Sequence, residues 1–489
     1  MKLDRPTLFR QQCHVAGQWI DASDGNSITV SNPADGSVLG SVPKLTAADV
    51  RKAIEAANNA LPAWREKSGK DRSRLIRRWY DLCMAHQEDL ATILTLEQGK
   101  PLKESRGEIA YGSSFLEWFA EEAKRTYGDV IPAATNDKRI IVIKQPVGVV
   151  AAITPWNFPN AMITRKAGAA LAAGCTIVVK PATATPYSAL ALAELALEAG
   201  IPAGVFNVVT GNSSVVGGEL TGNPLVRKLS FTGSTSVGKE LMAQCAPTMK
   251  KVSMELGGNA PFIVFDDADL EQAVAGVMAS KFRNAGQTCV CANRIFVQDG
   301  IYDAFAARLK EVVESQKVGN GMTDNVDLGP LIDDAAISKV QEHISDALSQ
   351  GASVLTGGQA HALGGLFFQP TILLDVSTNS KLMQEETFGP VAPLIRFSTE
   401  QEAVSMANDT PFGLAAYFFT TDYERSWRVA EALECGIVGV NEGIISTELA
   451  PFGGTKESGV GREGSKYGLD DYLEIKYICA GGIRSKSTV

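Results

Sequence analysis

The stretch GVVAAITPWNFPNAMITRKAGAALAAGCTIVVK, residues 148–180, decides the fold. It contains two short apolar runs, 148–153 and 176–180, separated by an alanine-rich segment of helical length at 161–173. Strands that alternate with helices of about 10–15 residues indicate parallel pairing and right-handed crossovers. The stretch therefore predicts one strand–helix–strand unit of a doubly wound α/β sheet, whose ligands bind beyond the carboxyl ends of the strands.

The same alternation continues along the chain. It predicts a helix at 188–199 and strands at 205–211, 228–233 and 251–256. A second α/β stretch is predicted to contain 261–270, 302–316, 390–397 and 415–420. We find no internal repeat and no long flexible linker between the two units. A cleft between two compact α/β units is therefore the expected ligand site.

Composition and charge narrow the function further. The 489 residues are 45% hydrophobic and 21% charged, which is typical of a folded globular protein. The net charge of −9, without a basic stripe, argues against nucleic acid as a partner. Eight scattered cysteines fit a reducing compartment, and no segment has the composition of a membrane span or signal peptide. We expect a cytoplasmic protein with neither a nucleic-acid nor a membrane partner.

Three polar side chains in unusual settings are candidates for catalysis. The chain has only four histidines, none in a glycine-rich or strand-end segment, so a cysteine or carboxylate mechanism is favoured. Cys289 in FRNAGQTCVCANR (282–294) lies on a polar loop, where a thiol can act as a nucleophile if its ionisation is assisted. Glu255, at a strand end before two glycines, is either a surface carboxylate or a base with a raised pKa. Asn157 in TPWNFP is either a turn residue or a rigid oxyanion donor.

Two further segments have the features of an anion site. FTGSTSVG (231–238) is a strand, a glycine turn and a helix start, where backbone N–H groups can face a pyrophosphate. Lys180 ends the strand of VVKPATATP (178–186) at the expected ligand edge of the sheet. Each signal is weak alone, because glycine turns are common.

Together, these motifs resemble the aldehyde dehydrogenase superfamily over nearly the whole chain. The motifs are PWNFP with Asn157, KPA with Lys180, FTGSTSVG, MELGG with Glu255, GQTC with Cys289, ETFGPV with Glu386, and PFGGTKESG (451–459). Three further segments are most similar to the succinate-semialdehyde dehydrogenase branch, namely 160–175, the triplet Cys289-Val290-Cys291 and 461–468.

The resemblance implies a fold with three parts. A Rossmann-like doubly wound cofactor domain would span 1–126 and 147–258, and a second α/β catalytic domain would span 259–438. A β-hairpin oligomerisation element would comprise 127–146 and 439–489. RIIVIKQ (139–145) reads as one arm of that hairpin, which would be an exposed edge unless it is paired. We expect a homo-oligomer, in the form of a dimer of dimers.

The resemblance also implies the chemistry. The Cys289 thiolate would add to an aldehyde, and the oxyanion would be held by the Asn157 amide and the Cys289 N–H. After transfer of two electrons to a nicotinamide, Glu255 would activate the water that hydrolyses the thioester. No metal is required.

The cofactor and substrate residues follow from the same motifs. The implied cofactor residues are Trp156, Asn157, Lys180, Pro181, Ala182, Thr183, Gly233, Ser234, Leu256 and Glu386. Thr183 stands where many NAD enzymes have a glutamate, so NADP is favoured, with NAD possible. Arg165, Arg283 and Ser446 would bind the distal carboxylate of a short semialdehyde, although each arginine alone could equally form a structural ion pair.

Several alternatives stay open at this level. The substrate could be glutarate semialdehyde or an uncharged aldehyde instead of succinate semialdehyde. An acyl-CoA-forming enzyme would lack the Glu255 carboxylate, and a non-catalytic dinucleotide-binding protein would lack one of the three catalytic candidates. A reversible Cys289–Cys291 disulfide would require an extended loop to tighten.

Overall fold

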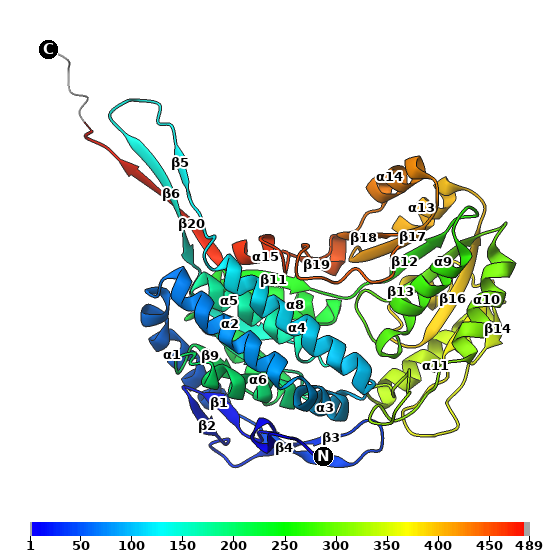
Figure 1. The fold of residues 1–489 in the computed structure, drawn as a ribbon, viewed down its shortest axis with the longest axis horizontal. Helices are drawn as coiled ribbons and strands as arrows, with labels where there is room; N and C mark the ends of the chain where they lie inside the picture. Colours follow the sequence, from blue (N-terminus) through cyan, green and yellow to red (C-terminus); the bar gives the residue numbers. More distant parts are fainter. Residues whose placement is uncertain (1, 484–489) are drawn as a thin grey trace.

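The chain forms two α/β bodies and a projecting arm in the computed structural model, which describes residues 2–483 (Figure 1). A large sheet lies at the centre of each body, and the arm carries a three-stranded sheet. A ribbon of β3 (Ser27–Ser31) and β4 (Val38–Pro43) lies beside the first body. Residues 1 and 484–489, which belong to the predicted cofactor domain and oligomerisation element, lie outside the described residues.

The first body contains the predicted doubly wound sheet. Its strand order is β19-β11-β10-β7-β8-β9-β1-β2, and the five central strands run parallel. Those five are β7 (Val149–Ile153), β8 (Thr176–Lys180), β9 (Phe206–Val208), β10 (Val226–Thr232) and β11 (Lys251–Glu255). The antiparallel edge strands are β1 (Cys13–Val15), β2 (Gln18–Ile20) and β19 (Gly459–Val460). The strand predicted at 205–211 ends earlier, because the chain turns at Gly211 into a helix.

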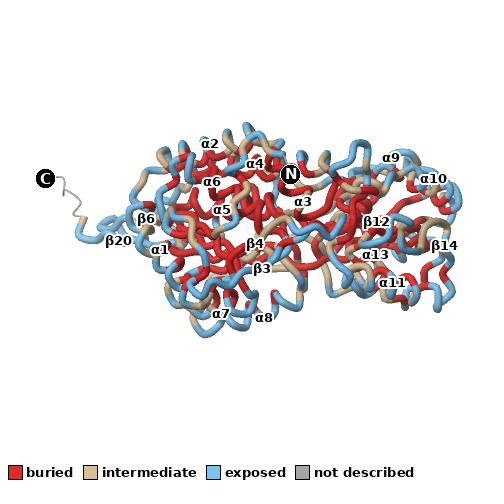
Figure 2. The backbone as a smooth tube through the Cα atoms, turned by 90° about the horizontal axis from the view of Figure 1, so that it is seen from below, coloured by how far each residue is buried: buried red, intermediate tan, exposed pale blue. Residues whose placement is uncertain are grey.

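Helices cover both faces of this sheet (Figure 2). One face carries α2 (Gly69–Ala85), α3 (Gln87–Gln98), α4 (Leu102–Glu122), α5 (Ala161–Ala173) and α6 (Tyr187–Glu198). The other face carries α1 (Ala47–Arg65), α7 (Ser213–Gly222) and α8 (Thr235–Cys245). Every residue of α5 is buried, which explains its alanine-rich sequence, since an all-round buried helix presents no polar face. It ends at Gly174, whose φ of 93° suits glycine.

The second body has the sheet order β14-β15-β16-β13-β12-β17-β18. Its strands are β12 (Ala260–Val264), β13 (Ala292–Gln298), β14 (Ser353–Thr356), β15 (Thr371–Leu374), β16 (Val391–Phe397), β17 (Ala415–Phe419) and β18 (Ile437–Val440). All are parallel neighbours except β14. Its helices are α9 (Leu270–Val277), α10 (Tyr302–Glu314), α11 (Asp334–Ser349), α12 (Lys381–Gln384), α13 (Glu400–Asn408) and α14 (Tyr423–Ala432).

The arm confirms the predicted hairpin. Strands β5 (Asp129–Ile131) and β6 (Arg139–Pro146) are antiparallel, and the chain turns at Asn136-Asp137. The last strand, β20 (Leu473–Ala480), pairs along β6 after the short helix α15 (Tyr467–Asp470). Ile475 is 72% exposed, so the arm presents apolar side chains to its surroundings.

The strand order places a ligand crevice at one edge of the first sheet. From β7 the chain crosses to β8 on one side, whereas β10 pairs with β7 on the other side. The loops that follow β7 and β10 therefore diverge, and such a switch point is where doubly wound sheets bind ligands. Within residues 2–483, no helix combines the length and the apolar composition needed to cross a membrane.

Candidate active site

A cavity of about 240 Å³ lies beyond the carboxyl ends of β7, β10 and β11. The predicted site residues that line it are Trp156, Asn157, Gly233, Ser234, Leu256, Cys289 and Glu386. The first five come from the first body, and the last two come from the second body. A cavity lined by both α/β bodies therefore lies where the sequence predicted a ligand site.

The loop that carries Cys289 is held in a tight conformation. It follows a π-helical turn at Met278–Phe282 and two residues with left-handed backbones, Asn284 (φ 51°) and Ala285 (φ 54°). Non-glycine residues adopt this conformation rarely and at a cost, so neighbouring contacts must hold it. The Asn284 N–H donates to Glu104 at 2.9 Å, and Gln98 donates to the Asn284 side chain at 3.0 Å.

The electrostatic surroundings of Cys289 oppose its ionisation. Burial, reinforced by the carboxylate charge of Glu386, raises the pKa of the thiol to about 12. Arg165 and Arg283 lower it, but they do not compensate for burial. The sequence predicted a site that assists ionisation, and this protein conformation does not do so. The thiol is therefore protonated at neutral pH and must pass its proton to a base as it attacks.

Asn157 is buried in the loop after β7, and hydrogen bonds hold both its side-chain amide and its backbone carbonyl. Its side-chain N–H donates to the Gln287 carbonyl at 3.0 Å. Its own carbonyl accepts from the ammonium of Lys100 at 2.7 Å and from the Asn284 amide at 3.2 Å. An amide nitrogen has two N–H donors, so one remains for a ligand in the cavity.

Glu255 is buried at the end of β11, not on the surface. Both of its carboxylate oxygens lack a hydrogen-bond partner within the described chain. Burial, together with the nearby Glu463 carboxylate, raises the pKa of Glu255 well above its ordinary value. This confirms the raised pKa expected for a strand-end carboxylate near glycines. Among the described residues that line the cavity there is neither a histidine nor Glu255 itself, but Leu256 and Gly257, which directly follow Glu255, do line it.

A buried ionic cluster that sequence reasoning missed surrounds Glu255. Glu463 pairs with Lys166 and lies 3.4 Å from the Arg165 guanidinium. These two cations hold the pKa of Glu463 below its ordinary value, even though burial acts in the opposite direction. The pKa values of two carboxyls in one buried site are thus shifted in opposite directions, that of Glu463 downwards and that of Glu255 upwards. Glu463 lies in the segment GREGSKYG, far from Glu255 in the sequence, so nothing in the sequence indicated that the two residues lie close together.

The cofactor candidates lie along the same sheet edge. Lys180 ends β8 in a buried position, where its ammonium donates to the neighbouring Pro181 carbonyl at 3.3 Å, and burial lowers its pKa to about 8. Ser234 is the N-cap of α8, and within residues 2–483 no side-chain hydrogen bond caps the start of that helix. Glu386 accepts from the Gly258 N–H at 3.2 Å, and burial raises its pKa to about 7.

Pro181, Ala182 and Thr183 follow Lys180 away from the cavity. Thr183 is exposed and lines a separate groove of about 820 Å³ beside the β3–β4 ribbon. The residues predicted to bind the cofactor thus extend from the cavity to the surface.

One member of the predicted carboxylate clamp, Arg165, donates to the hydroxyl of Tyr111 on α4, a residue that sequence reasoning missed. The Ser446 side chain acts to lower the pKa of the same phenol, although burial raises that pKa overall. Arg165, Arg283 and Ser446 are not among the residues that line the 240 Å³ cavity. Arg283 lies over the Phe158 ring at 5.2 Å and forms no ion pair within residues 2–483. Arg165, by contrast, does form the structural ion pair that was its alternative interpretation. Tyr111 gave no signal in the sequence, because it stands among ordinary helical residues.

Cys291 is buried on the turn that follows Thr288. The Cys291 N–H donates to the Thr288 carbonyl at 3.1 Å, so the loop is a turn and not the extended strand assumed from spacing. Its sulfur lies 3.4 Å from the ammonium of Lys281, which also donates to Asn293 at 2.9 Å. Both Cys289 and Cys291 are free thiols in this structure.

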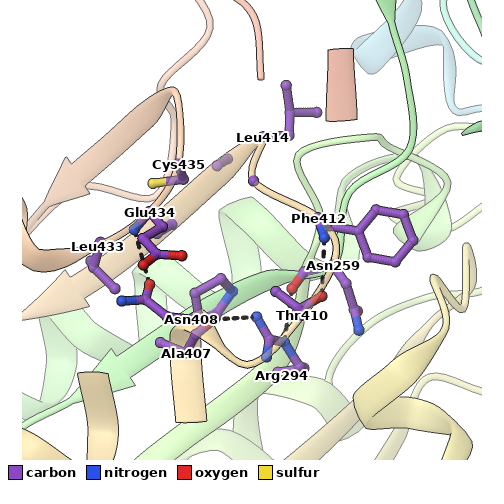
Figure 3. A pocket seen from close by; sticks show the side chains of 14 residues that line it. Asn259, Arg294, Ala407, Asn408, Thr410, Phe412, Leu414, Leu433, Glu434 and Cys435 are labelled. Carbon is purple, nitrogen blue, oxygen red and sulfur yellow. Dashed lines mark hydrogen bonds between the residues drawn. The ribbon is translucent and has the colours of Figure 1, made fainter. Parts of the chain in front are cut away.

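A second pocket, beside β12 and β13, is structural (Figure 3). Its volume of about 10 Å³ is no more than one water molecule needs. The buried Arg294 guanidinium donates to the carbonyls of Asn259, Met406 and Ala407 at 2.8–3.0 Å. Arg294 thereby ties the end of α13 to the sheet instead of offering a ligand site.

The comparisons with known proteins agree with this geometry. A family model described as "Aldehyde dehydrogenase family" matches residues 19–478, and the chain belongs to that family. It is 66% identical to succinate-semialdehyde dehydrogenase [NADP(+)] GabD of Escherichia coli, over 98% of this chain and 100% of that one. It is 65% identical to glutarate-semialdehyde dehydrogenase of Pseudomonas aeruginosa, over 99% and 100% of the two chains. The crystal structure of an NADP-dependent enzyme of E. coli superposes with a TM-score of 0.98 at 65% identity, covering 98% and 100%.

Proposed function

We propose that this protein oxidises succinate semialdehyde to succinate with NADP, and that NAD is tolerated. The observation that carries the proposal is the single cavity in which a thiol, an amide donor and a strand-edge crevice meet. The relatives named above act on semialdehydes that carry a carboxylate at the far end.

The reaction proceeds on the sulfur of Cys289. As the thiol adds to the aldehyde carbon, its proton passes to the carboxylate form of Glu255 and on to solvent, and the free N–H of Asn157 together with the Cys289 N–H stabilises the oxyanion. Loss of a hydride from the former aldehyde carbon, which a bound nicotinamide would accept, leaves a thioester. The carboxylate form of Glu255, whose pKa is raised, then takes a proton from water, which attacks the thioester and releases the acid and the Cys289 thiol.

The residues present fit a pyridine dinucleotide, whose nicotinamide supplies the two-electron acceptor when bound. The uncapped N-terminus of α8 offers backbone N–H groups to a pyrophosphate. Gly257 keeps the chain close to Glu386, since a Cβ there would lie 2.8 Å from that carboxylate. Trp156, Leu256 and Gly233 line the same cavity, and Lys180, Pro181, Ala182 and Thr183 continue towards the adenosine end. Thr183 can donate to a 2′-phosphate, where a carboxylate would repel it.

The residues proposed to bind the distal carboxylate of the substrate include two cations. Arg283 carries a charge that no described carboxylate pairs, and Arg165 and Ser446 complete the clamp together with Tyr111. Glutarate semialdehyde is the second candidate, because it presents the same carboxylate one carbon farther away and its dehydrogenase is 65% identical.

We further propose the division into domains and an assembly. Residues 1–126 and 147–258 form the cofactor domain, 259–438 form the catalytic domain, and 127–146 with 439–489 form the oligomerisation element. The exposed apolar arm supports a dimer of dimers. Eight free cysteines support a cytoplasmic location.

The decisive experiment compares succinate semialdehyde with butanal, which has the same chain length and no carboxylate. The wild-type protein should prefer the semialdehyde. Arg283→Met should raise KM for the semialdehyde about a hundredfold, because a hydrogen-bonded ion pair with substrate is lost, and should leave KM for butanal unchanged. NADPH formation at 340 nm reports both rates. Equal effects on the two aldehydes would contradict the clamp.

A further inference from the structure

We propose that the hydroxyl of Tyr111 donates a hydrogen bond to the distal carboxylate of the semialdehyde and is a specificity-determining residue. The inference deepens the proposed function and rests on it. Tyr111 belongs to α4, a helix of the first body, and none of the predicted cofactor or substrate residues comes from this helix.

The phenol oxygen of Tyr111 has lone pairs that accept hydrogen bonds and a proton that can be donated. Arg165 donates to this oxygen from Nη2. A tyrosine hydroxyl has two acceptor positions and one proton. The guanidinium occupies one acceptor position, and no acceptor for the hydroxyl proton is found among residues 2–483, so the proton is available to a ligand.

Arg165 is held rigidly behind the tyrosine. Its guanidinium lies 3.4 Å from the Glu463 carboxylate and 4.2 Å from the centre of the Phe452 ring. Only 2% of Arg165 is exposed, whereas Tyr111 is partly exposed. Of this bonded pair, Tyr111 is therefore the more accessible residue.

The charges around Tyr111 also favour an incoming carboxylate. Glu463 already balances part of the charge of Arg165, while Arg283 has no partner in the described chain. Burial raises the pKa of the Tyr111 phenol, but both arginine charges act in the opposite direction, so both favour negative charge at this position. An incoming carboxylate would meet the Arg283 charge and the directed Tyr111 proton together. Arg165 would attract the carboxylate both through its hydrogen bond to the tyrosine and through its own positive charge.

The test is Tyr111→Phe, assayed with succinate semialdehyde and with butanal. A hydrogen bond to a charged group accounts for about tenfold to hundredfold in affinity. KM for the semialdehyde should rise by that factor, while KM for butanal and both kcat values stay within about twofold. Tyr187→Phe is the matched control, since Tyr187 is buried elsewhere and its hydroxyl has no partner in the described chain. It should change neither substrate.

The outcomes separate the two proposals. A wild-type protein that does not prefer the semialdehyde defeats the proposed function, and this inference with it. A wild-type preference that survives in Tyr111→Phe defeats the inference alone. If Tyr111→Phe does not fold, 3-fluorotyrosine at position 111 provides a second test, because its more acidic hydroxyl is a stronger donor. KM for the semialdehyde should then fall, and an unchanged or higher value would overturn the proposal.

Discussion

The buried ion pair of Lys100 and Glu108 should position the oxyanion donor, and replacing it tests this. The ammonium of Lys100 lies 2.6 Å from Glu108 and 2.7 Å from the Asn157 carbonyl, and it sits over the Phe158 ring at 3.9 Å. The other Glu108 oxygen accepts the N–H groups of Asn160 and Ala161 at 3.0 and 3.2 Å. The pair thereby fixes both ends of the loop that carries Asn157.

The magnitude follows from burial. Both side chains are 1% exposed. Lys100→Met leaves an unpaired buried carboxylate, which costs about 3–5 kcal/mol. The entropy of unfolding is about 1 kcal/mol per kelvin for a chain of this length, so Tm should fall by about 3–5 °C. Lys100→Met combined with Glu108→Gln removes both charges but keeps the acceptor for the two N–H groups, so most of the stability should return.

Activity should not return with stability in the double variant. The Asn157 carbonyl would keep only the Asn284 donor, and the oxyanion donor would be less well placed. We expect kcat/KM to fall about tenfold, which corresponds to about 1.4 kcal/mol, less than the loss of an oxyanion donor itself. Alkylation of Cys289 by iodoacetamide forms no oxyanion and should proceed at the wild-type rate. A double variant with both wild-type Tm and wild-type kcat/KM would refute the positioning role.

Three further predictions concern the catalytic and cofactor residues. Glu255→Gln should slow thioester hydrolysis by at least a hundredfold, since the base is lost. An acyl adduct at Cys289 should then appear by intact-protein mass spectrometry, and normal turnover without an adduct would contradict the role. Thr183→Glu should shift the ratio of kcat/KM values towards NAD by about tenfold or more, because a carboxylate repels the 2′-phosphate; an unchanged ratio would count against this reading. Because the pKa of Cys289 is about 12, its alkylation without coenzyme should accelerate about tenfold per pH unit between about pH 7 and 9. A plateau in the alkylation rate below about pH 9 would contradict this pKa. Glu386→Gln removes a charge that raises the pKa of Cys289, so alkylation of the Cys289 peptide at a fixed pH should be faster in this variant.

The sequence predicted the central architecture because its signals are local. The helix predicted at 161–173 is α5, and the strand predicted at 176–180 is β8, with the same bounds. Parallel strands bring their carboxyl ends to one edge, so a ligand site beyond those ends was expected, and Asn157 and Gly233 both line the cavity found there. The hairpin arm predicted at 139–145 corresponds to β6, since strand signals also depend on adjacent residues.

Other features depend on contacts between distant segments and were not predictable from spacing. Glu463 meets Lys166, which is 297 positions away in the sequence. The sequence by itself determined a doubly wound sheet, a second α/β unit and a set of motif residues, because periodicity and turn chemistry operate over a few positions. Only the tertiary structure decided the electrostatics, because a pKa depends on burial and on whichever charges the fold brings close. Burial raised the pKa of Cys289 and of Glu255, nearby cations lowered that of Glu463, and the fold brought the Arg165 guanidinium to the Tyr111 hydroxyl.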